Sequence, residues 1–217
     1  MAVTPEQVAE RAAAMQAAFV EAARRNEWAW IADEFYAENC TYLCEYAGTM
    51  RVFAKNRDEI RATHYGRDMM VGWEGWSFPI ERYTSHGNQI ITHWWNRGPG
   101  RRADGSYYQT PGVSFITVGD DGLFTDQLDL FDLAHQMHLC DELEDAGLLS
   151  PTLKQNWVIP MKQRLIAQPE LIKTAVEEML RFESSNQLGN RMIVEETELG
   201  GIKLPAGTLV TQKNKWR

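Results

Sequence analysis

Apolar residues near the start of the chain recur at the spacing of one helix face. This face carries Val8, Ala12, Met15, Phe19 and Ala22. Thr4 is followed by Pro5 and, three residues after it, by Gln7, which is a capping-box pattern, so a long amphipathic helix is expected to open the fold. Residues 27–37 predict a short second helix, and "NRDEIRATHYGRDM" predicts a third that begins after its asparagine.

Strand-like runs of aromatic and β-branched residues begin with "NCTYLCEY", between the second and third predicted helices. Four more runs follow residue 76, namely "WSFPIERYTS", "QIITHWWNRG", "SYYQTPGVSFITVG" and "LFTDQLDLFDL". Turns rich in Gly, Asn and Asp separate these four, which predicts hairpins. Helices followed by an antiparallel meander describe an α+β domain in which a curved sheet wraps around the N-terminal helices.

The C-terminal third returns to helix before it ends in short strands. "AHQMHLCDELEDAG" predicts a helix that stops at Gly147, and Ser150-Pro151 has the form of the next helix start. We therefore expect two parts, an α+β domain at residues 1–147 and a helical and short-β extension at residues 148–217.

Charge is distributed unevenly between these parts. Residues 1–147 hold 12 Lys/Arg against 23 Asp/Glu, whereas residues 148–217 hold 10 against 7. An acidic main body disfavours binding to nucleic acid. No apolar run reaches the roughly 18 residues that cross a bilayer, and the N-terminus is too acidic for a signal peptide, so a cytoplasmic protein without a membrane partner is expected. Three cysteines without a Cys-x-x-Cys pair fit free thiols.

Alternation along the strands identifies side chains that share one face. The three sets are Tyr42 with Cys44, His93 with Trp95, and Gln127 with Asp129 and Phe131. If these faces point into the domain, Asp129 is a carboxylate among aromatic rings, and burial would raise its pKa toward the range of a general acid or base. The alternatives are an ion pair with Arg97 or a position in solvent.

The order of elements resembles the SnoaL-like branch of the nuclear transport factor 2-like superfamily. The resemblance covers residues 8–140 and is carried by "NRDEIRATHYG" before the meander and by "VGDDGLFTDQLDLFD" at its last hairpin. It implies a cone-shaped α+β barrel with an internal pocket. Polyketide cyclases, ketosteroid isomerases and limonene epoxide hydrolases share this fold, so the fold does not select a reaction.

Similarity to limonene epoxide hydrolase assigns roles to individual residues. "LDLFD" resembles the last strand that supplies the base, which implies Asp129, and "TYLC" resembles the strand that positions water, which implies Tyr42. Cys44 stands where that family has Asn, and His93 and Trp95 stand where it has an acid pair. The set Asp129, Tyr42 and His93 instead resembles a proton shuttle in which a phenol or imidazole stabilises an enolate or alkoxide.

Several other side chains are candidates for the wall of the pocket. Cys44, His64, Trp95 and Phe131 are expected to contact the substrate, within an aromatic-rich sequence suited to an apolar ligand. A satisfied core or surface histidine is the alternative for His64. His135 and His138 have helical metal-ligand spacing, but a solvated helix face explains them better, and no metal or cofactor is expected.

The C-terminal segment resembles a different family. "AVEEMLRF", "NR" and "ELGGIKLPAGTLV", within residues 161–210, are similar to bacterial haem-thiolate monooxygenases of the cytochrome P-450 type. The Glu-x-x-Arg pair of that family corresponds here to Glu178 and Arg181, and Arg191 matches an arginine that contacts a haem propionate there. The only cysteine near the segment is Cys140, upstream of it, so no axial thiolate is expected and a truncated fragment is predicted.

These observations predict a dimeric SnoaL-like protein that binds a small apolar metabolite. Acid/base chemistry on a terpenoid, steroid or polyketide-like substrate is expected, with hydrolase, isomerase, cyclase and dehydratase left open. The alternative is a non-catalytic binding or interaction module linked to a cytochrome P-450 pathway, with a tail that is a fusion remnant without haem activity.

Overall fold

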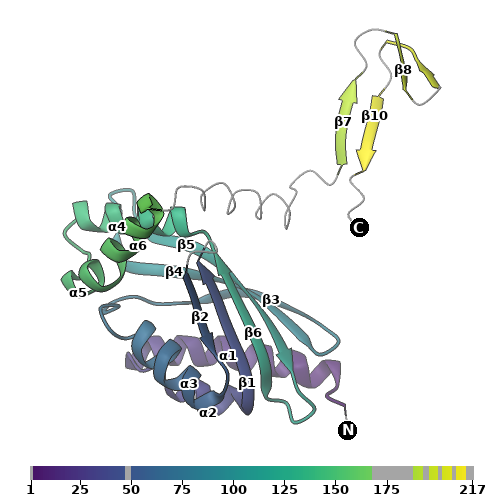
Figure 1. The fold of residues 1–217 in the computed structure, drawn as a ribbon. Helices are drawn as coiled ribbons and strands as arrows, with labels where there is room; N and C mark the ends of the chain where they lie inside the picture. The colour runs from purple at the N-terminus through teal and green to yellow at the C-terminus, as the bar shows by residue number, and fades with distance from the viewer. Residues whose placement is uncertain are drawn as a thin grey trace. The chain divides into compact units, whose positions relative to one another are not determined.

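The computed structural model describes residues 2–46, 50–167, 188–192, 196–199, 202–206 and 209–213. Contacts divide the chain into two compact units, Met1–Ile172 and Lys173–Arg217. The first unit is mixed α+β, with a curved sheet and N-terminal helices (Figure 1), which confirms the predicted fold class.

The N-terminal helical elements are α1 (Pro5–Arg25), α2 (Trp30–Phe35), α3 (Arg57–Glu59) and the π-helix η1 (Ile60–Asp68). The predicted capping box is confirmed, because Thr4 and Gln7 exchange backbone-to-side-chain hydrogen bonds of 2.9 and 3.3 Å. The π-helical form of the third helix was not predicted. Such segments are rare in proteins, and those that occur are often found at functional sites.

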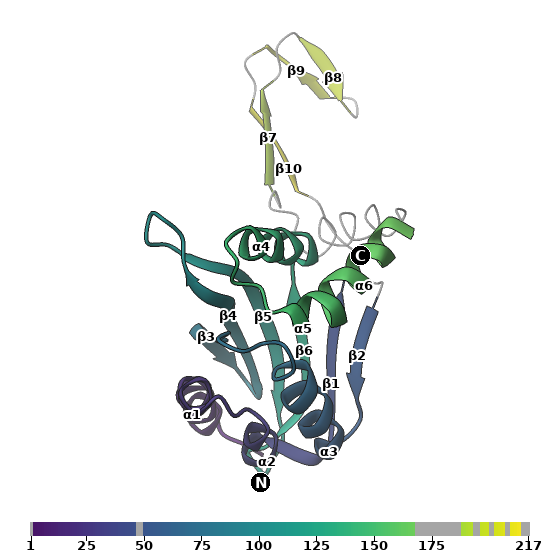
Figure 2. The ribbon, with the colours of Figure 1, turned by 90° about the vertical axis from the view of Figure 1, so that its left-hand side faces the viewer.

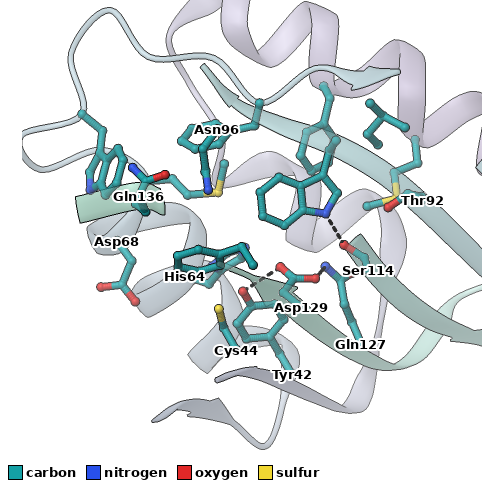
Figure 3. Close-up of a pocket in the computed structure, with 18 of the residues that line it drawn as sticks. Tyr42, Cys44, His64, Asp68, Thr92, Asn96, Ser114, Gln127, Asp129 and Gln136 are labelled. Atoms are coloured by element: carbon teal, nitrogen blue, oxygen red, sulfur yellow. Dashed lines mark hydrogen bonds between the residues drawn. The ribbon is translucent and has the colours of Figure 1, made fainter. Parts of the chain in front are cut away.

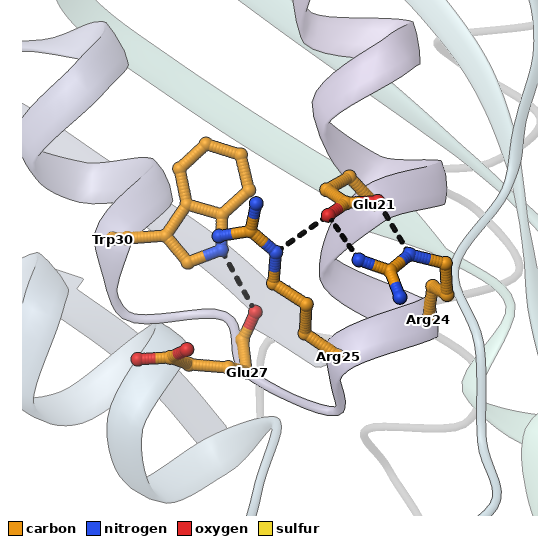
Figure 4. Close-up of polar contacts among 5 residues, drawn as sticks. All are labelled: Glu21, Arg24, Arg25, Glu27 and Trp30. Atoms are coloured by element: carbon orange, nitrogen blue, oxygen red, sulfur yellow. Dashed lines mark hydrogen bonds and ion pairs between the residues drawn. The ribbon is translucent and has the colours of Figure 1, made fainter.

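A cluster of polar contacts secures the turn from α1 to α2 (Figure 4). Arg24 and Arg25 both donate to the Glu21 carboxylate, and the Trp30 indole donates to the Glu27 carbonyl at 3.0 Å. The hydrogen bond from Arg24 and then that from Arg25 lower the pKa of Glu21 to about 2. The helix ends at Asn26 in the left-handed conformation, a residue type that tolerates it.

The sheet contains β1 (Tyr36–Tyr46), β2 (Met50–Ala54), β3 (Ile80–His86), β4 (Gln89–Arg101), β5 (Tyr107–Val118) and β6 (Phe124–Phe131). Its spatial order is β2-β1-β6-β5-β4-β3, and β1 runs parallel to β6 while the other neighbours are antiparallel. The four hairpin-linked strands after residue 76 form the predicted meander. β2, a five-residue strand at the sheet edge, was not predicted.

The sheet curves around a core that the N-terminal helices fill from one side. α1 lies against β3, where the Gln16 side chain donates to the Ile80 carbonyl at 2.8 Å. Trp28, Phe35 and Tyr36 are fully buried at this end. Figure 2 shows α1 and α2 at one end of the curved sheet and α4 at the other.

Helices after the sheet cover its second end. They are α4 (Leu133–Asp145), α5 (Pro151–Leu153), the π-helix η2 (Lys154–Val158) and α6 (Ile159–Ala167). The predicted stop at Gly147 is confirmed by its positive φ of 69° just beyond α4. Leu153, Val158 and Met161 join the same hydrophobic core, so the compact unit extends past residue 147.

The second unit has two small antiparallel pairs among its described residues. β7 (Leu188–Met192) pairs with β10 (Leu209–Lys213), and β8 (Thr197–Leu199) pairs with β9 (Ile202–Leu204). These strands agree with the short-β extension expected at the end of the chain.

Candidate functional site

A cavity lies between the sheet and the helices of the first unit. It encloses about 690 Å³ of empty space, including the part that is open to solvent. Its apolar wall consists of Met15, Phe19, Met69, Trp73, Phe78, Ile80, Trp94, Phe131 and Trp157. Its polar lining consists of Tyr42, Cys44, His64, Asp68, Thr92, Asn96, Ser114, Gln127, Asp129 and Gln136.

A row of small polar side chains crosses four strands of the sheet on the cavity side. Thr92 of β4 lies opposite Ser114 of β5, Ser114 lies opposite Asp129 of β6, and Asp129 lies opposite Cys44 of β1. Residues at the same register position on adjacent strands share one face, so the pairing brings these groups together. Figure 3 shows Asp129 near the centre of the group.

Asp129 is buried, with 6% of its surface exposed, and accepts hydrogen bonds on both carboxylate oxygens. The Tyr42 hydroxyl donates to Oδ2 at 2.9 Å, and the Gln127 amide donates to Oδ1 at 2.8 Å (Figure 3). Tyr42 and Gln127 are themselves register partners on β1 and β6. The parallel pairing of these two strands therefore places Tyr42 beside Asp129, whereas Gln127 lies two residues before Asp129 on the same strand.

A chain of phenols orients the Gln127 amide. The Tyr36 hydroxyl donates to Oε1 of Gln127, and the Tyr65 and Tyr36 hydroxyls lie 2.9 Å apart. With its oxygen engaged by Tyr36, the Gln127 amide presents its nitrogen to Asp129. Because Tyr36 is fully buried, desolvation raises its pKa well above 10, with Tyr65 as the next cause. Tyr36 is therefore a neutral donor.

Two opposing effects set the pKa of Asp129. Burial raises it above the usual value of 3.8, and hydrogen bonds from Ser114, Gln127 and Tyr42 act against the rise. Desolvation disfavours the carboxylate, whereas donors favour it. The result is a carboxylate that binds a proton more readily than an exposed aspartate does.

Trp94 extends this network to the apolar wall. Its indole donates to the Ser114 hydroxyl at 2.8 Å. Trp94 lies opposite Gly112 on β5, and a Cβ at Gly112 would come within 2.3 to 2.5 Å of three atoms of the indole ring. Only glycine leaves room for the indole to lie across the strand.

His64 reaches the cavity from η1 and stacks on the ring of Tyr42, with centroids 4.1 Å apart. Burial lowers its pKa to about 3. The imidazole is therefore neutral near pH 7 and able to donate one N–H and accept at the other nitrogen. Of the two positions considered for His64, the structure shows the one that lines the cavity rather than a core or surface position.

Two predicted site residues lie elsewhere. His93 and Trp95 were expected to face the cavity, but Thr92, Trp94 and Asn96 occupy that face of β4. His93 instead stacks edge-on against Trp95 and places Nδ1 3.1 Å from the Glu81 carboxylate. The expected phase of β4 was wrong by one residue, because a Trp-Trp pair gives no alternation from which to choose a face.

The other predicted contacts line the cavity. Cys44 and Phe131 do so beside Tyr42 and Asp129, on the faces predicted for β1 and β6. The proposed alternative for Asp129 does not occur, because Arg97 donates to Gln109 at 2.8 Å and stacks on Tyr107 instead. Whether the lining residues bind a substrate stays a prediction.

Sequence reasoning missed several polar groups of the lining. Ser114 lies on β5, whose phase was not assigned, and Asn96 lies on β4, whose phase was assigned wrongly. Asp68 and Gln136 lie on helices. Strand alternation predicts that Ser114 faces the cavity only when its pairing with Asp129 is known. Trp157 of η2, which packs against Trp73 with ring centroids 5.6 Å apart, was also missed.

The residues predicted in the C-terminal segment are only partly described. Glu178 and Arg181 lie outside the described residues. Arg191 belongs to β7, opposite Val210 on β10. In the described part of the chain, no group of three or more His, Cys, Asp or Glu side chains is arranged to hold a metal ion, and none of the helices is long and apolar enough to cross a membrane.

Comparison with known proteins assigns the family. The SnoaL-like domain family matches residues 17–127. The chain belongs to this SnoaL-like family. Its matched region includes the last part of α1, Tyr42, His64 and most of the meander, and it ends at Gln127, two residues before Asp129.

One curated relative shares a short stretch with this SnoaL-like chain. Over 66 residues, which are 30% of this chain, it is 44% identical to Protein AknT of Streptomyces galilaeus. The chain spans about 15% of the length of that relative. The predicted resemblance of residues 161–210 to cytochrome P-450-type monooxygenases is not shown by these comparisons and stays a prediction.

Solved structures with a similar shape include SnoaL-like and NTF2-like proteins. A candidate SnoaL-like polyketide cyclase of Jannaschia sp. CCS1 has a TM-score of 0.46 and 16% identity, covering 64% of this chain and 96% of its own. An NTF2-like protein of Burkholderia thailandensis has the same TM-score and identity, covering 63% and 97%. One from Anabaena variabilis has a TM-score of 0.46 and 14% identity, covering 60% and 93%. Likenesses at this level carry no argument about activity.

Proposed function

We propose that the cavity binds a small, largely apolar metabolite and that Asp129 moves a proton at a carbon or oxygen of this ligand. The observation that carries the proposal is a buried carboxylate in the cavity wall, held by Tyr42 at 2.9 Å and with a pKa raised by burial. A base of this kind is desolvated and oriented before the ligand arrives.

The best-supported reaction class is proton transfer next to a carbonyl group, as in isomerases, cyclases and dehydratases. The ionised Asp129 would take a proton from the carbon, and the electron pair would move into the carbonyl oxygen. The imidazole in the cavity is His64 rather than His93, so His64 is the proposed donor to that oxygen. A neutral imidazole suits this role because its N–H can donate a hydrogen bond to the oxygen as negative charge develops there.

The wall supports an apolar substrate. Rings of Trp73, Trp94 and Trp157 line it together with Phe78 and Phe131. Aromatic side chains bind flat hydrocarbon bodies through large contact areas. A terpenoid, steroid or polyketide-like compound therefore remains the proposed ligand class, and hydrolysis remains open as the reaction.

A non-catalytic binding module is the second candidate. It is favoured by the same contacts, because both oxygens of Asp129 already accept hydrogen bonds from Tyr42 and Gln127. A carboxylate with both oxygens engaged also serves to hold β1 against β6. In this case the link to a cytochrome P-450 pathway, predicted from residues 161–210, would define the protein's context.

The predicted homodimer is also proposed, through the outer face of the sheet. Ile91 and Phe115 are register partners there and are 38% and 39% exposed. A second copy would cover such a patch of neighbouring apolar side chains. The cytoplasmic location stays a prediction.

Turnover by the wild type and by Asp129→Asn tests the function. Panels of terpenoid, steroid and polyketide-type ketones, epoxides and esters would be incubated with both proteins. The amide keeps the size of the carboxylate, so ligand binding should persist while turnover falls by at least about 100-fold. Turnover that the substitution leaves unchanged would remove Asp129 from the proposed role.

A further inference from the structure

A second group of polar side chains lines the cavity away from Asp129. In Figure 3, Gln136, Asn96 and Asp68 lie to one side of His64, and Asp129, Ser114 and Gln127 lie to the other. The first three come from α4, β4 and η1, which are far apart in the sequence. Convergence of polar groups from separate elements onto an otherwise aromatic wall is typical of a ligand subsite.

Gln136 is completely buried, and only half of its amide is satisfied by the protein. The hydroxyl of Thr110, also fully buried, donates to Oε1 of Gln136 at 2.6 Å. Nε2 is buried without a partner at hydrogen-bond geometry among the described residues, where the Cys140 thiol is the weak acceptor near it. Buried polar groups are nearly always hydrogen-bonded, so this nitrogen calls for an acceptor from the cavity.

Asp68 lacks a hydrogen-bond donor for one of its carboxylate oxygens. Its Oδ1 accepts from Nε of Arg67 at 2.7 Å, whereas Oδ2 is buried without a hydrogen-bond partner in the described part of the chain. This oxygen calls for a donor. Asn96, 6% exposed, adds an amide that both donates and accepts.

We propose that Gln136, Asn96 and Asp68 form a second subsite, which binds a hydroxyl group of the ligand. A hydroxyl both accepts, as Gln136 requires, and donates, as Asp68 requires. An acidic group on the ligand would bring a second negative charge beside Asp68. A hydrocarbon end would leave Nε2 of Gln136 and Oδ2 of Asp68 unpaired. The inference rests on the proposed function, because it assumes that the ligand's reacting group lies at Asp129.

The ligand class is therefore an apolar body with oxygen functions at both ends. One end carries a carbonyl directed to Asp129 and His64, and the other carries a hydroxyl. A site built to hydrogen-bond a hydroxyl discriminates strongly against the analogue that lacks it. Recognition of this second group, rather than the shape of the wall alone, would select the substrate.

Equilibrium binding of matched ketone pairs tests the subsite. One pair is 5α-androstan-3-one and its 17β-hydroxy derivative, and a smaller pair is 2-tetralone and 6-hydroxy-2-tetralone. Calorimetric titration would compare the wild type with Gln136→Met and Asp68→Asn. The control is Gln163→Met, which changes an exposed glutamine on α6.

The wild type and the control should bind the hydroxylated member of the better-fitting pair about tenfold more tightly than the plain ketone. Gln136→Met and Asp68→Asn should reduce this preference to about twofold or less, with little change for the plain ketone. Thermal unfolding checks that Gln136→Met, which also leaves Thr110 without its acceptor, is folded.

If both ketones bind but the wild type shows no hydroxyl preference, or if both variants retain it, the subsite is overturned while the proposed function stands. If neither ketone of either pair binds, the apolar ligand class is overturned together with the subsite.

Discussion

The hydroxyl of Tyr42 lies 2.9 Å from Oδ2 of Asp129 and donates a hydrogen bond to it. The two residues are 87 positions apart in the sequence, and the parallel pairing of β1 with β6 brings them together. Tyr42 also stacks on His64, so one phenol contacts both proposed proton-handling groups. Changes at Tyr42 should therefore alter the protonation of Asp129.

Tyr42→Phe should move the acid limb of the pH–rate profile to higher pH. The phenol stabilises the charged form of Asp129, so its loss adds to the rise in pKa that burial causes. Activity that needs the carboxylate then disappears sooner as pH falls. Tyr83→Phe, on β3 and outside the lining, is the control. An unchanged acid limb would show that the hydrogen bond does not act on the group that titrates.

His64 should make the fold sensitive to acid. Burial lowers its folded-state pKa to about 3 from a usual value of 6.5, so the unfolded chain binds the proton first as pH falls. The stability that neutral His64 contributes is complete above about pH 6.5. It is lost as pH falls toward 3, at roughly 1.4 kcal/mol of unfolding free energy per pH unit. Urea unfolding should therefore show wild type losing on the order of 2 kcal/mol more than His64→Phe between neutral pH and about pH 5. Parallel pH dependences for the two proteins would contradict the lowered pKa of His64.

Gly112→Ala should displace the indole of Trp94, because the added methyl group would meet it at 2.3 Å. We expect a loss of about 1 to 3 kcal/mol in unfolding free energy from overpacking. The indole N–H signal of Trp94 should shift as its bond to Ser114 breaks. Ser114→Ala is the matched comparison, since it removes the acceptor without the clash. A Gly112→Ala protein with wild-type stability and an unshifted signal would show that the indole has another place to lie.

Phe115→Lys should convert the proposed dimer to a monomer. Phe115 lies on the outer face of the sheet opposite Ile91, so a charge there disturbs no cavity residue. Sedimentation equilibrium would measure the mass, and Val20→Lys on α1, where the side chain is 63% exposed, serves as control. A monomeric wild type, or a dimer that survives Phe115→Lys, would exclude this interface.

Local sequence signals predicted much of the fold. Thr4 and Asn56 were identified as helix caps because capping depends on residues within one turn, and Gly147 ended α4 for the same reason. β2 was missed because five residues at a sheet edge carry little pattern. The π-helical register of η1 was missed because a one-residue shift in hydrogen bonding leaves the helical pattern almost unchanged.

The site was predictable only along single strands. Alternation placed Asp129 and Phe131 on one face of β6, where they line the cavity. The same reasoning failed on β4, where His93 was chosen instead of its neighbours. The network through Ser114 and Tyr36 depends on strand register and on contacts between distant segments, which no local pattern encodes.

The central claim is that Asp129 removes a proton from a carbon beside a carbonyl group. Exchange of such protons in D₂O, followed by NMR with 5α-androstan-3-one and 2-tetralone as probes, measures this step without knowledge of the natural product. The wild type should accelerate exchange of at least one probe above the buffer rate, and Asp129→Asn should lower that acceleration by about 100-fold or more. Exchange that is equally fast with Asp129→Asn, or no acceleration by the wild type of a probe that it binds, would contradict the claim.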